Sequence, residues 1–395
     1  MAATSGTRAK LGAQARLDAV KDDLIALSRR IHASPELGYE EEQASTWLAE
    51  TLDGAGFAVQ RGICGLPTAF RATKGSGPLH IALCAEYDAL PGIGHACGHN
   101  VIAAMSTGAA IAAAAVADDV GLTISVIGTP AEEVLRTGGK ILLLDRGGFD
   151  GVHASMMAHP APWDVALWPI VAASFFEVRY TGKAAHAAAF PDQGINAADA
   201  LTIAQTSIGL LRQQLRQSDR VHGIVTGGGD AFNIIPAHAS ADYAVRARTL
   251  DGLNEVYEKV IHCFQAGALA TGATLKIVGG DKPFAHMEDD RDMVGFYQAN
   301  AEALGRKFPA PDEPSPATTI STDMGNVSLV MPSIHPAISL DSLPAVPHQP
   351  EFAAAAITPA AELAVYDGAL SLAWTAIDIA STPAVRDRLL AAERG

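Results

Sequence analysis

Residues 79–85 read Leu-His-Ile-Ala-Leu-Cys-Ala, and residues 94–100 read Gly-His-Ala-Cys-Gly-His-Asn. The first stretch is a largely apolar run, which predicts a buried strand. The second places a thiol and two imidazoles in one short loop, whose glycines let the side chains of Cys97 and His99 turn toward one point. Thiolate and neutral imidazole are preferred ligands of zinc and related metals. A metal site at the end of a buried strand is therefore the first hypothesis.

The composition limits the classes of protein to consider. A chain of 395 residues is long for one hydrophobic core, so we expect two domains. The net charge of -15, from 43 acidic against 28 basic residues, argues against nucleic acid or an anionic membrane surface as a partner. A small-molecule substrate remains compatible with this charge, because one local arginine can override it.

The cysteines and the apolar segments indicate the cellular location of the protein. Four scattered cysteines do not resemble a secreted disulfide framework. The segment Met1–Lys10 is not followed by the apolar core of a signal peptide. The Ala-rich stretch 103–117 is interrupted by polar residues and too short for a membrane span. We expect a cytoplasmic protein.

Up to about residue 170, predicted strands alternate with predicted helices. Helical spacing of apolar residues over 17–31 predicts one opening amphipathic helix, and further helices are expected at about 41–54, after the Cys/His loop, and at 135–144. Strand-like runs occupy residues 57–60, 68–72, 79–85, 123–127 and 152–157. This alternation predicts a mostly parallel sheet covered on both faces.

Beyond residue 170 the order changes. Strands and helices are expected in the order β-α-β-β-α-β between residues 174 and 278, which is the ferredoxin-like split motif. Helical patterning resumes at about residue 289 and continues to the end of the chain. The prediction is an α/β catalytic domain, residues 1–171 and 288–395, interrupted by an inserted α+β domain, residues 172–287.

Candidate ligands follow three successive strands. Cys97 and His99 come after one strand, Glu132 and Glu133 after the second, and His159 after the third. Sites in open α/β sheets form at the carboxyl ends of the strands, so these five side chains can meet in one crevice. His348 is a sixth candidate, which the strand pattern does not select.

The adjacent carboxylates Glu132 and Glu133 can divide two tasks. One can bind a metal, while its neighbour takes the proton of a water as that water attacks a carbonyl. The alternative is a pair of solvated acids in the first turn of a helix, which the helix dipole stabilises. The neighbouring strand ends favour the catalytic interpretation.

Cys97 also admits another chemistry. It could act as a nucleophile paired with His99 or His95, as in cysteine hydrolases. Residues so close in sequence seldom reach attack geometry, and Glu132 and Glu133 would then have no role. Cys84, inside an apolar run, is expected to be a core residue.

Taken together, the motifs resemble one known family. It is the two-metal amidohydrolase and peptidase family of aminoacylases, glutamate carboxypeptidase, aminobenzoyl-glutamate hydrolase and the plant indole-acetyl-amino-acid hydrolases, and the likeness is greatest to the aminoacylase-like dipeptidase branch. The matching segments span nearly the whole chain and are 32–40, 94–99, 129–133, 157–160, 182–187, 321–328 and 332–336.

The resemblance implies a role for each candidate. Cys97 would be shared by two metals, zinc or manganese, with His99 and Glu133 on one metal and His159 and His348 on the other. Glu132 would be the general base. Many members of the family have His-x-Asp and an aspartate bridge where this chain has Glu86-Tyr87-Asp88 and Cys97, a difference that bears on metal preference.

The resemblance also assigns residues around the metals. Asp88 would orient a ligand. His186, in a lid and dimerisation domain, would reach the site of the neighbouring subunit in a homodimer and stabilise the oxyanion. Asn233 and Arg246 would bind substrate, with Arg248 leaving open which guanidinium does so.

The expected reaction is hydrolysis of the amide bond in a small N-acyl amino acid, a dipeptide or an aminobenzoyl-glutamate-like compound. A catalytically silent binding protein of the same fold is the further alternative.

Overall fold

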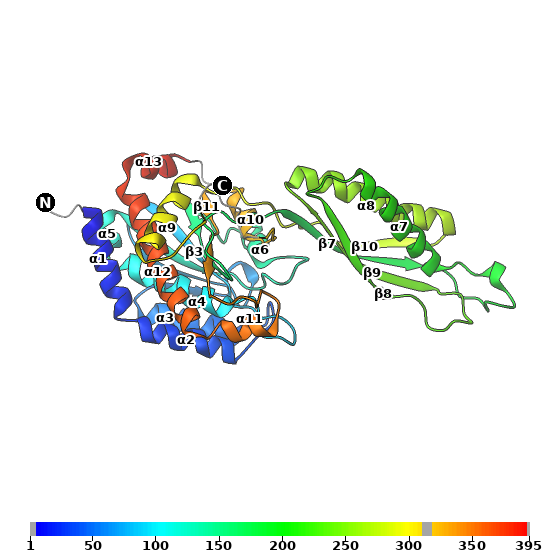
Figure 1. Cartoon of the computed structure of the whole chain (residues 1–395), viewed down its shortest axis with the longest axis horizontal. Coiled ribbons are helices and arrows are strands. Elements are labelled where there is room, and N and C mark those ends of the chain that lie inside the picture. Colours follow the sequence, from blue (N-terminus) through cyan, green and yellow to red (C-terminus); the bar gives the residue numbers. More distant parts are fainter. Residues whose placement is uncertain (1–4, 310–317, 393–395) are drawn as a thin grey trace.

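The computed structural model describes residues 5–309 and 318–392. The chain forms two units, each with its own sheet and its own hydrophobic core (Figure 1). The large unit contains a six-stranded sheet and most of the helices. The small unit contains a four-stranded sheet with two long helices and projects away from the large unit.

The sheet of the large unit has the strand order β1-β2-β4-β3-β5-β11. Strands β4, β3, β5 and β11 run parallel, and β2 and β1 are added antiparallel at one edge. The sheet is therefore largely parallel, which confirms the predicted fold class. The bounds are β1 Ala58–Arg61, β2 Phe70–Gly75, β3 Leu79–Ala85, β4 Leu122–Gly128, β5 Ala154–Met156 and β11 Ser333–Ile334. Two short strands, β6 His159–Ala161 and β12 Ala337–Ser339, pair separately.

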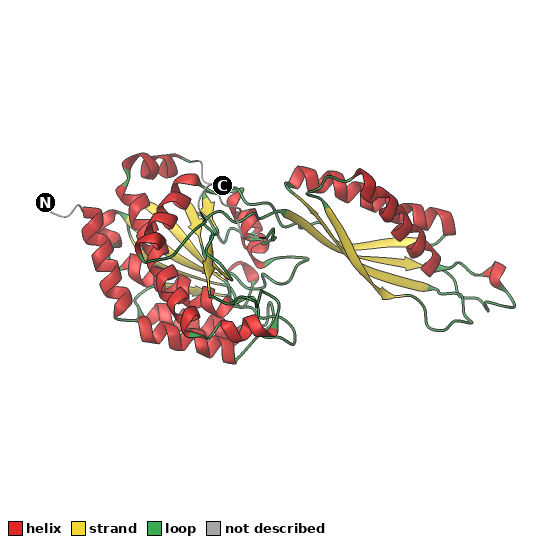
Figure 2. Ribbon diagram, viewed as in Figure 1, coloured by secondary structure: helices red, strands yellow, loops and turns green. Residues whose placement is uncertain are grey.

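Helices cover both faces of this sheet (Figure 2). Their bounds are α1 Ser5–Asp18, α2 Lys21–Ala33, α3 Glu42–Gly54, α4 His99–Ala114, α5 Ala117–Val120, α6 Gly139–Asp145, α9 Arg291–Ala303, α10 Met324–Ser328, α11 Pro350–Ala355, α12 Pro359–Ser381 and α13 Pro383–Ala391. A short 3₁₀ helix, η1, spans Ile63–Gly65.

Two of the predicted helices differ from the structure. The expected single helix over 17–31 is divided by a turn at Ala19 and Val20 into α1 and α2. The apolar stripe continues across the turn, because Leu17 and Leu24 are both buried, so periodicity alone does not reveal the break. The helix expected at 135–144 begins only at Gly139, since Gly138 has a φ of 58° that a helix does not accommodate.

Helix α4 is the centre of the large unit. Every one of its residues is buried, which explains why it is Ala-rich and has no polar face. It packs against α12, α2 and α1. Helix α12 is the one helix of the described residues that is long and apolar enough to cross a membrane, but 78% of its most apolar window is buried inside the protein. It therefore serves as a core helix.

The small unit has the strand order β10-β7-β9-β8, all antiparallel. With helices α7 and α8 packed on the sheet, the chain order is β7-α7-β8-β9-α8-β10, which is the ferredoxin-like motif. The bounds are β7 Ala172–Thr181, α7 Ala197–Leu211, β8 Arg220–Gly227, β9 His238–Ala247, α8 Leu250–Thr271 and β10 Thr274–Gly279, with 3₁₀ helices η2 Pro191–Gln193 and η3 Arg212–Gln214.

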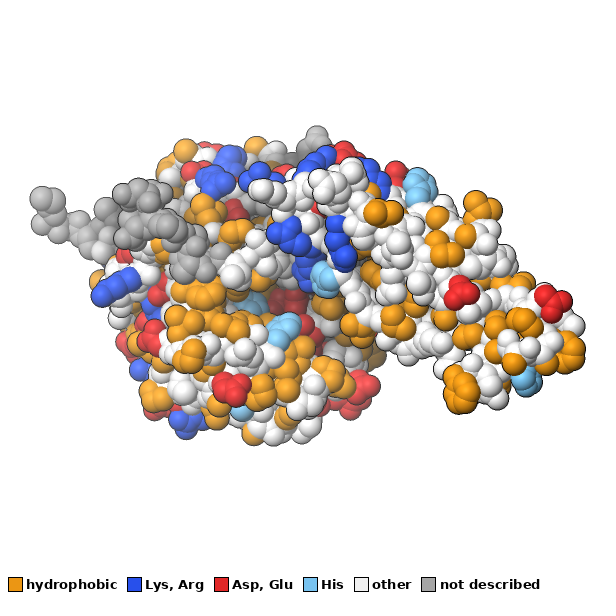
Figure 3. Space-filling model, turned by 45° about the vertical axis from the view of Figure 1, so that its right-hand side comes forward, with side chains coloured by type: hydrophobic (Ala, Val, Ile, Leu, Met, Phe, Trp, Pro, Cys, Tyr) orange, Lys and Arg blue, Asp and Glu red, His pale blue; other side chains and the backbone are white. Residues whose placement is uncertain are grey.

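A hollow separates the two units, and histidine and acidic side chains are visible within it (Figure 3). Ion pairs and hydrogen bonds cross between the units. Arg136, in the loop after β4, lies 2.5 Å from the Asp242 carboxylate on β9. Arg246 Nη1 donates to Ser321 Oγ at 2.6 Å. These contacts fix the end of the small unit that adjoins the large one.

Candidate active site

The loop between β3 and α4 brings Asp88, Cys97 and His99 to the carboxyl end of the sheet. His99 is the first residue of α4, preceded by Gly98 with a φ of 80°. A Cβ at Gly98 would lie 3.0 Å from the ring of Pro160, so glycine also allows this loop to approach the segment that carries His159. The loop sequence thus creates the close approach that the site needs.

The loop after β4 presents Glu132 and Glu133. Ala131, just before them, has a φ of 60°, an unfavourable value for a residue with a Cβ. The buried Glu41 carboxylate stabilises this conformation by accepting the Ala131 N–H at 2.8 Å, and it also accepts the Thr68 hydroxyl at 2.9 Å. Glu41 therefore holds the backbone from which the two catalytic candidates extend.

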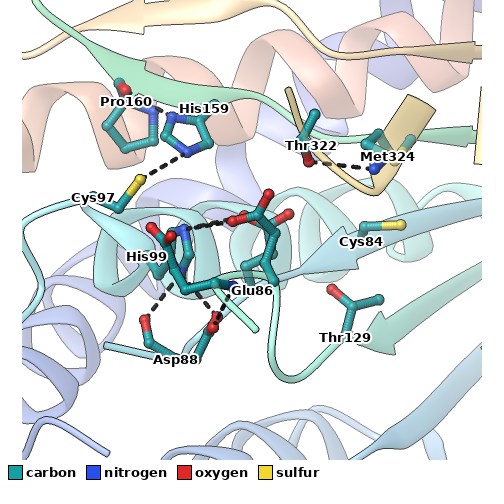
Figure 4. A network of polar contacts seen from close by, with 12 residues as sticks. Cys84, Glu86, Asp88, Cys97, His99, Thr129, His159, Pro160, Thr322 and Met324 are labelled. Carbon is teal, nitrogen blue, oxygen red and sulfur yellow. Dashed lines mark hydrogen bonds and ion pairs between the residues drawn. The ribbon is translucent and has the colours of Figure 1, made fainter. Parts of the chain in front are cut away.

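His159 and His348 complete the arrangement from two further segments. The Nδ1–H of His159 donates to the Pro160 carbonyl at 2.8 Å, which leaves Nε2 facing Cys97 Sγ at 3.5 Å (Figure 4). The backbone N–H of His348 donates to the Ala96 carbonyl at 2.9 Å, and His348 has a φ of 69°. A loop far along the chain is thereby attached to the Cys97 loop.

Asp88 organises two of these side chains at once. One carboxylate oxygen accepts the His99 Nδ1–H at 2.9 Å, and the other accepts the Glu133 backbone N–H at 2.9 Å. The hydrogen bond to His99 fixes the ring so that Nε2 faces the site, which is the usual arrangement of a metal-binding histidine. The structure thus gives Asp88 an orienting geometry.

The donor atoms form two groups that share one residue. Cys97, His99 and His159 lie within 4.8 Å of one another, and so do Cys97, Glu133 and His348. The resemblance led us to expect His99 with Glu133 and His159 with His348. The structure groups them differently, because His159 Nε2 faces Cys97 while His348 Nε2 lies 3.3 Å from Glu133 Oε1.

The donor set fits divalent metal ions. His99 Nε2 and Glu133 Oε1 are buried and make no hydrogen bond of good geometry among the described residues, although Glu133 Oε1 lies 3.3 Å from His348 Nε2. Leaving such atoms without a partner costs about 1–3 kcal/mol each, so their convergence points to a ligand. Thiolate, imidazole and carboxylate together suit zinc or manganese. The residues of both groups therefore match the expected cofactor.

Burial and neighbouring charge shift the pKa values in the site. Burial, with the charge of Glu133, raises the pKa of the Cys97 thiol well above its usual value. Burial, with the charges of Glu86 and Glu133, also raises the pKa of Glu132 well above the usual range. Burial opposes protonation of His99, but Asp88 and Cys97 outweigh it and raise the pKa of His99. The surplus of negative charge is what a metal cation would balance.

A cluster of three buried charged residues beside the site was not predicted from the sequence. Lys140 Nζ lies 2.5 Å from both the Glu86 and the Asp323 carboxylates, and all three side chains have no exposed surface. Lysine within an apolar helical segment is typical of a surface position, so the pattern did not indicate that Lys140 is buried. The available signals were Glu86, directly after β3 and two residues before Asp88, and Asp323, in the matching segment 321–328.

His95 is not part of either donor group. It is buried and packs beside His32, with ring centroids 6.0 Å apart. Cys84 is fully buried in β3, which confirms its interpretation as a core residue. The four cysteines are free thiols.

The candidates on the small unit do not lie in one place. Arg246 pairs with Ala173 at the end of the sheet next to the large unit. His186 and Asn233 are exposed and adjacent at the opposite end, where the Ala187 N–H donates to the Asn233 carbonyl at 3.0 Å. Strand β7 from Ala173 to Thr181 separates the two ends by about 26 Å. This chain alone thus brings Arg246, but not His186 or Asn233, to the junction with the large unit, where Arg246 contacts Ser321.

Comparisons with known proteins agree with this architecture. The model of peptidase family M20/M25/M40 matches residues 82–366. The Xaa-Arg dipeptidase of Mus musculus is 39% identical over 391 residues, covering 95% of this chain and 90% of the relative. One of the subunits of the p-aminobenzoyl-glutamate hydrolase of Escherichia coli (strain K12) is 31% identical and covers 66% of this chain and 58% of that protein.

Solved structures share the fold. A putative aminohydrolase from methicillin-resistant Staphylococcus aureus has a TM-score of 0.75 at 19% identity, covering 93% of this chain and 99% of that one. A dinuclear metal-binding peptidase of the M20 family from Bacillus subtilis has a TM-score of 0.68 at 20% identity, covering 92% and 99%. The chain therefore belongs to peptidase family M20/M25/M40, and it is an enzyme of the metal-dependent dipeptidase and amidohydrolase class.

Proposed function

We propose that this protein is a binuclear metal-dependent hydrolase of the amide bond in a dipeptide or a small N-acyl amino acid. The observation that carries the proposal is the position of Cys97, which belongs to both donor groups. A thiolate common to two groups is the arrangement expected of a bridging ligand. One metal would be held by Cys97, His99 and His159, and the other by Cys97, Glu133 and His348.

The chemistry then divides between the metals and Glu132. When bound, divalent metals polarise the amide carbonyl and lower the pKa of water, which makes a carboxylate sufficient as a base. Glu132 lies at the edge of the donor set, with Oε2 4.0 Å from His99 Nε2, and belongs to neither group that contains Cys97. We assign it to take the proton of the attacking water and deliver it to the leaving amine.

We further propose that residues 172–287 form a lid and dimerisation domain on a catalytic domain of residues 1–171 and 288–395. His186 and Asn233 lie too far along the small unit to serve the site of their own chain in this conformation. The same two residues of a second copy of the chain would instead reach this site. Strand β8 is at the sheet edge, and its Ile224 and Val225 side chains are exposed by 66% and 51%. Exposed apolar residues on an unpaired edge favour a homodimer through this unit.

Arg246 and the relatives support the substrate class. Arg246, at the junction of the two units, would bind a free carboxylate of the substrate, while His186 of the second copy would stabilise the oxyanion. The names of the relatives, an Xaa-Arg dipeptidase and an aminobenzoyl-glutamate hydrolase, support a small substrate with such a carboxylate. Four free thiols support a cytoplasmic location.

The substitution Glu132→Gln tests the assignment of the base. It keeps the shape of the side chain but removes the proton acceptor, so we expect turnover of a dipeptide panel to fall about 10³- to 10⁴-fold while two metals per chain remain bound. The exposed Glu258 on α8 offers a matched control, Glu258→Gln, which should leave turnover unchanged. Substantial activity in Glu132→Gln would refute the assignment.

A cysteine hydrolase is the alternative that one contact favours, since Cys97 Sγ lies 3.5 Å from His159 Nε2. That enzyme would be inactivated by thiol alkylation and indifferent to chelators. We expect the opposite: loss of activity in chelator and recovery with zinc or manganese. Burial also keeps the Cys97 thiol protonated, which weakens it as a nucleophile. A silent binding protein would show neither metal uptake nor hydrolysis.

A further inference from the structure

The cluster of Lys140, Glu86 and Asp323 lies directly behind the site and is fully buried. Lys140 Nζ contacts one oxygen of each carboxylate at 2.5 Å, and the Lys140 backbone N–H donates to the second Asp323 oxygen at 2.8 Å. Both Asp323 oxygens and one Glu86 oxygen are therefore engaged. Two carboxylates against one ammonium leave the cluster with a net charge of -1.

The fourth carboxylate oxygen, Glu86 Oε2, is different. It is buried and has no hydrogen-bond partner among the described residues. It faces the metal donors, because it lies 3.4 Å from His99 Nε2, and Figure 4 shows the Glu86 carboxylate beside the His99 ring. An oriented, buried anionic oxygen that accepts no hydrogen bond is costly unless a cation is present.

The spacing of these two atoms is that of two ligands on one metal. Metal–nitrogen and metal–oxygen bonds of about 2.0–2.2 Å place neighbouring ligand atoms about 3–3.5 Å apart. Glu86, His99 and Glu132 also form a group whose donor atoms lie within 4.8 Å. Of these carboxylates, only Glu86 has its other oxygen fixed by a lysine, which pre-orients it toward His99.

Charge gives an independent reason. With a metal bound, the group of Cys97, His99 and His159 would supply two neutral imidazoles and a shared thiolate, whereas the other group also contains the Glu133 carboxylate. The metal beside His99 and His159 would therefore lack an anionic ligand of its own. The net charge of -1 on the Lys140 cluster lies on that side of the site.

We propose that Glu86 is an additional ligand, giving a carboxylate oxygen to the metal held by Cys97, His99 and His159, with Lys140 as the residue that orients it. This inference rests on the proposed binuclear site. With Glu86 this position would have four protein ligands, and the attacking water would raise the ligand number above four. A hard oxygen donor and that ligand number favour manganese over tetrahedral zinc. Of the two metal positions, the one held by Cys97, His99 and His159 would thus favour manganese because of Glu86.

Metal binding by Glu86→Gln and Asp323→Asn tests the proposal. Each substitution removes one negative charge from the cluster around Lys140, but only Glu86 faces His99. We would strip each protein with a chelator, titrate Mn²⁺ and Zn²⁺ by calorimetry, and count bound metal by elemental analysis. We expect Glu86→Gln to weaken Mn²⁺ binding at one of the two sites by about 100-fold or more. Loss of a residue that only hydrogen-bonds to a ligand typically weakens metal binding by about 10- to 100-fold, so the loss of a direct ligand should reach or exceed the top of that range. Zinc should be affected less, and Asp323→Asn should stay within a few-fold of wild type.

The absorption spectrum of the Co²⁺-substituted wild-type protein gives a measurement that needs no variant. A site with more than four ligands absorbs weakly, while a tetrahedral site absorbs strongly. We expect one weakly absorbing ion, and Glu86→Gln should increase its absorption. Two tetrahedral ions in wild type, or equal Mn²⁺ affinities in the two variants, would overturn the role of Glu86. No metal uptake by the wild type would instead refute the binuclear function itself.

Discussion

The two units of this protein prepare their functional residues to different degrees. In the large unit, Asp88 fixes His99 and Glu133 at 2.9 Å each, Glu41 fixes the loop before Glu132, and the donor atoms are largely buried. In the small unit, His186 and Asn233 are exposed and contact mainly their own segment. The difference teaches that the metal site is pre-organised within one chain, whereas contacts to the substrate depend on movement or on a second copy.

The largest expected effect tests the pre-organised half. Cys97→Ala should abolish measurable turnover and lower metal content below two per chain, because the thiolate shared by both donor groups is lost. Cys84→Ala is the matched control, since Cys84 is a buried thiol that contacts Ser155 at 3.3 Å and no donor group. It should keep both metals, as measured by elemental analysis. Two metals bound in an inactive Cys97→Ala protein would favour the cysteine hydrolase.

The second prediction concerns the exposed half. His186→Ala should lower kcat by about 10²- to 10³-fold, the usual effect of losing an oxyanion donor, with metal content unchanged. His238→Ala, an exposed histidine on the same unit, should have no effect.

Mixing subunits then distinguishes the source of His186. Glu132→Gln and His186→Ala proteins, unfolded and refolded together, should regain part of the wild-type activity, because a mixed dimer has one site with both residues intact. An absence of recovery in a mixture that does form mixed dimers would mean that each small unit closes on the site of its own chain.

A smaller effect is expected where the two units meet. Arg246→Ala should reduce kcat/KM for substrates with a free carboxylate by about 10- to 100-fold, the range for a hydrogen bond to a charged group. Arg248→Ala should change kcat/KM little, because Arg248 is exposed and Arg246 is the one that contacts Ser321. An amidated substrate should remove the difference between Arg246→Ala and wild type. Equal losses in both arginine variants would contradict this choice between them.

The sequence could predict the strand-end part of the site for a definite physical reason. Parallel strands end at one edge, so residues after β3, β4 and β5 converge whatever their separation in the chain. His348 does not follow a strand of this sheet, and its position depends on one backbone hydrogen bond to Ala96. Only the resemblance to a family pointed to it.

The buried ion pairs could not be predicted from the sequence, for a different reason. Lys140 and Asp323 are 183 positions apart and no sequence pattern links them, although Asp323 lies in the matching segment 321–328, so their pairing exists only in the tertiary structure. The grouping of donors around Cys97 likewise depends on which ring nitrogen faces inward, which Asp88 and the Pro160 carbonyl decide. Residue types could be predicted from the sequence, but not these orientations.

The smallest expected effect on catalysis concerns Glu41, the buried carboxylate that holds the loop before Glu132. Burial, with the charge of Asp88, raises the pKa of Glu41 to about 7. An unfolded glutamate has a pKa near 4.3, so the folded protein holds a proton that the unfolded chain has lost between these values. The contribution of Glu41 to stability is then fully present below about pH 4.3 and is lost as pH rises through 7, by at most about 4 kcal/mol.

Glu41→Gln removes this ionisation but keeps an acceptor for the Ala131 N–H. The free energy of unfolding of the variant should therefore increase relative to that of wild type as pH rises from 4.5 to 8, while turnover changes only a few-fold. Glu50→Gln, on the exposed face of helix α3, which begins directly after Glu41, controls for the loss of a carboxylate. Wild type and both variants are compared at each pH. Any effect of pH-dependent metal binding on the free energy of unfolding that is the same in all three proteins therefore drops out of the difference. A relative stability that does not vary with pH would mean that the backbone before Glu132 is held by an ionised carboxylate, so the strained loop would depend on charge and not on a neutral hydrogen bond.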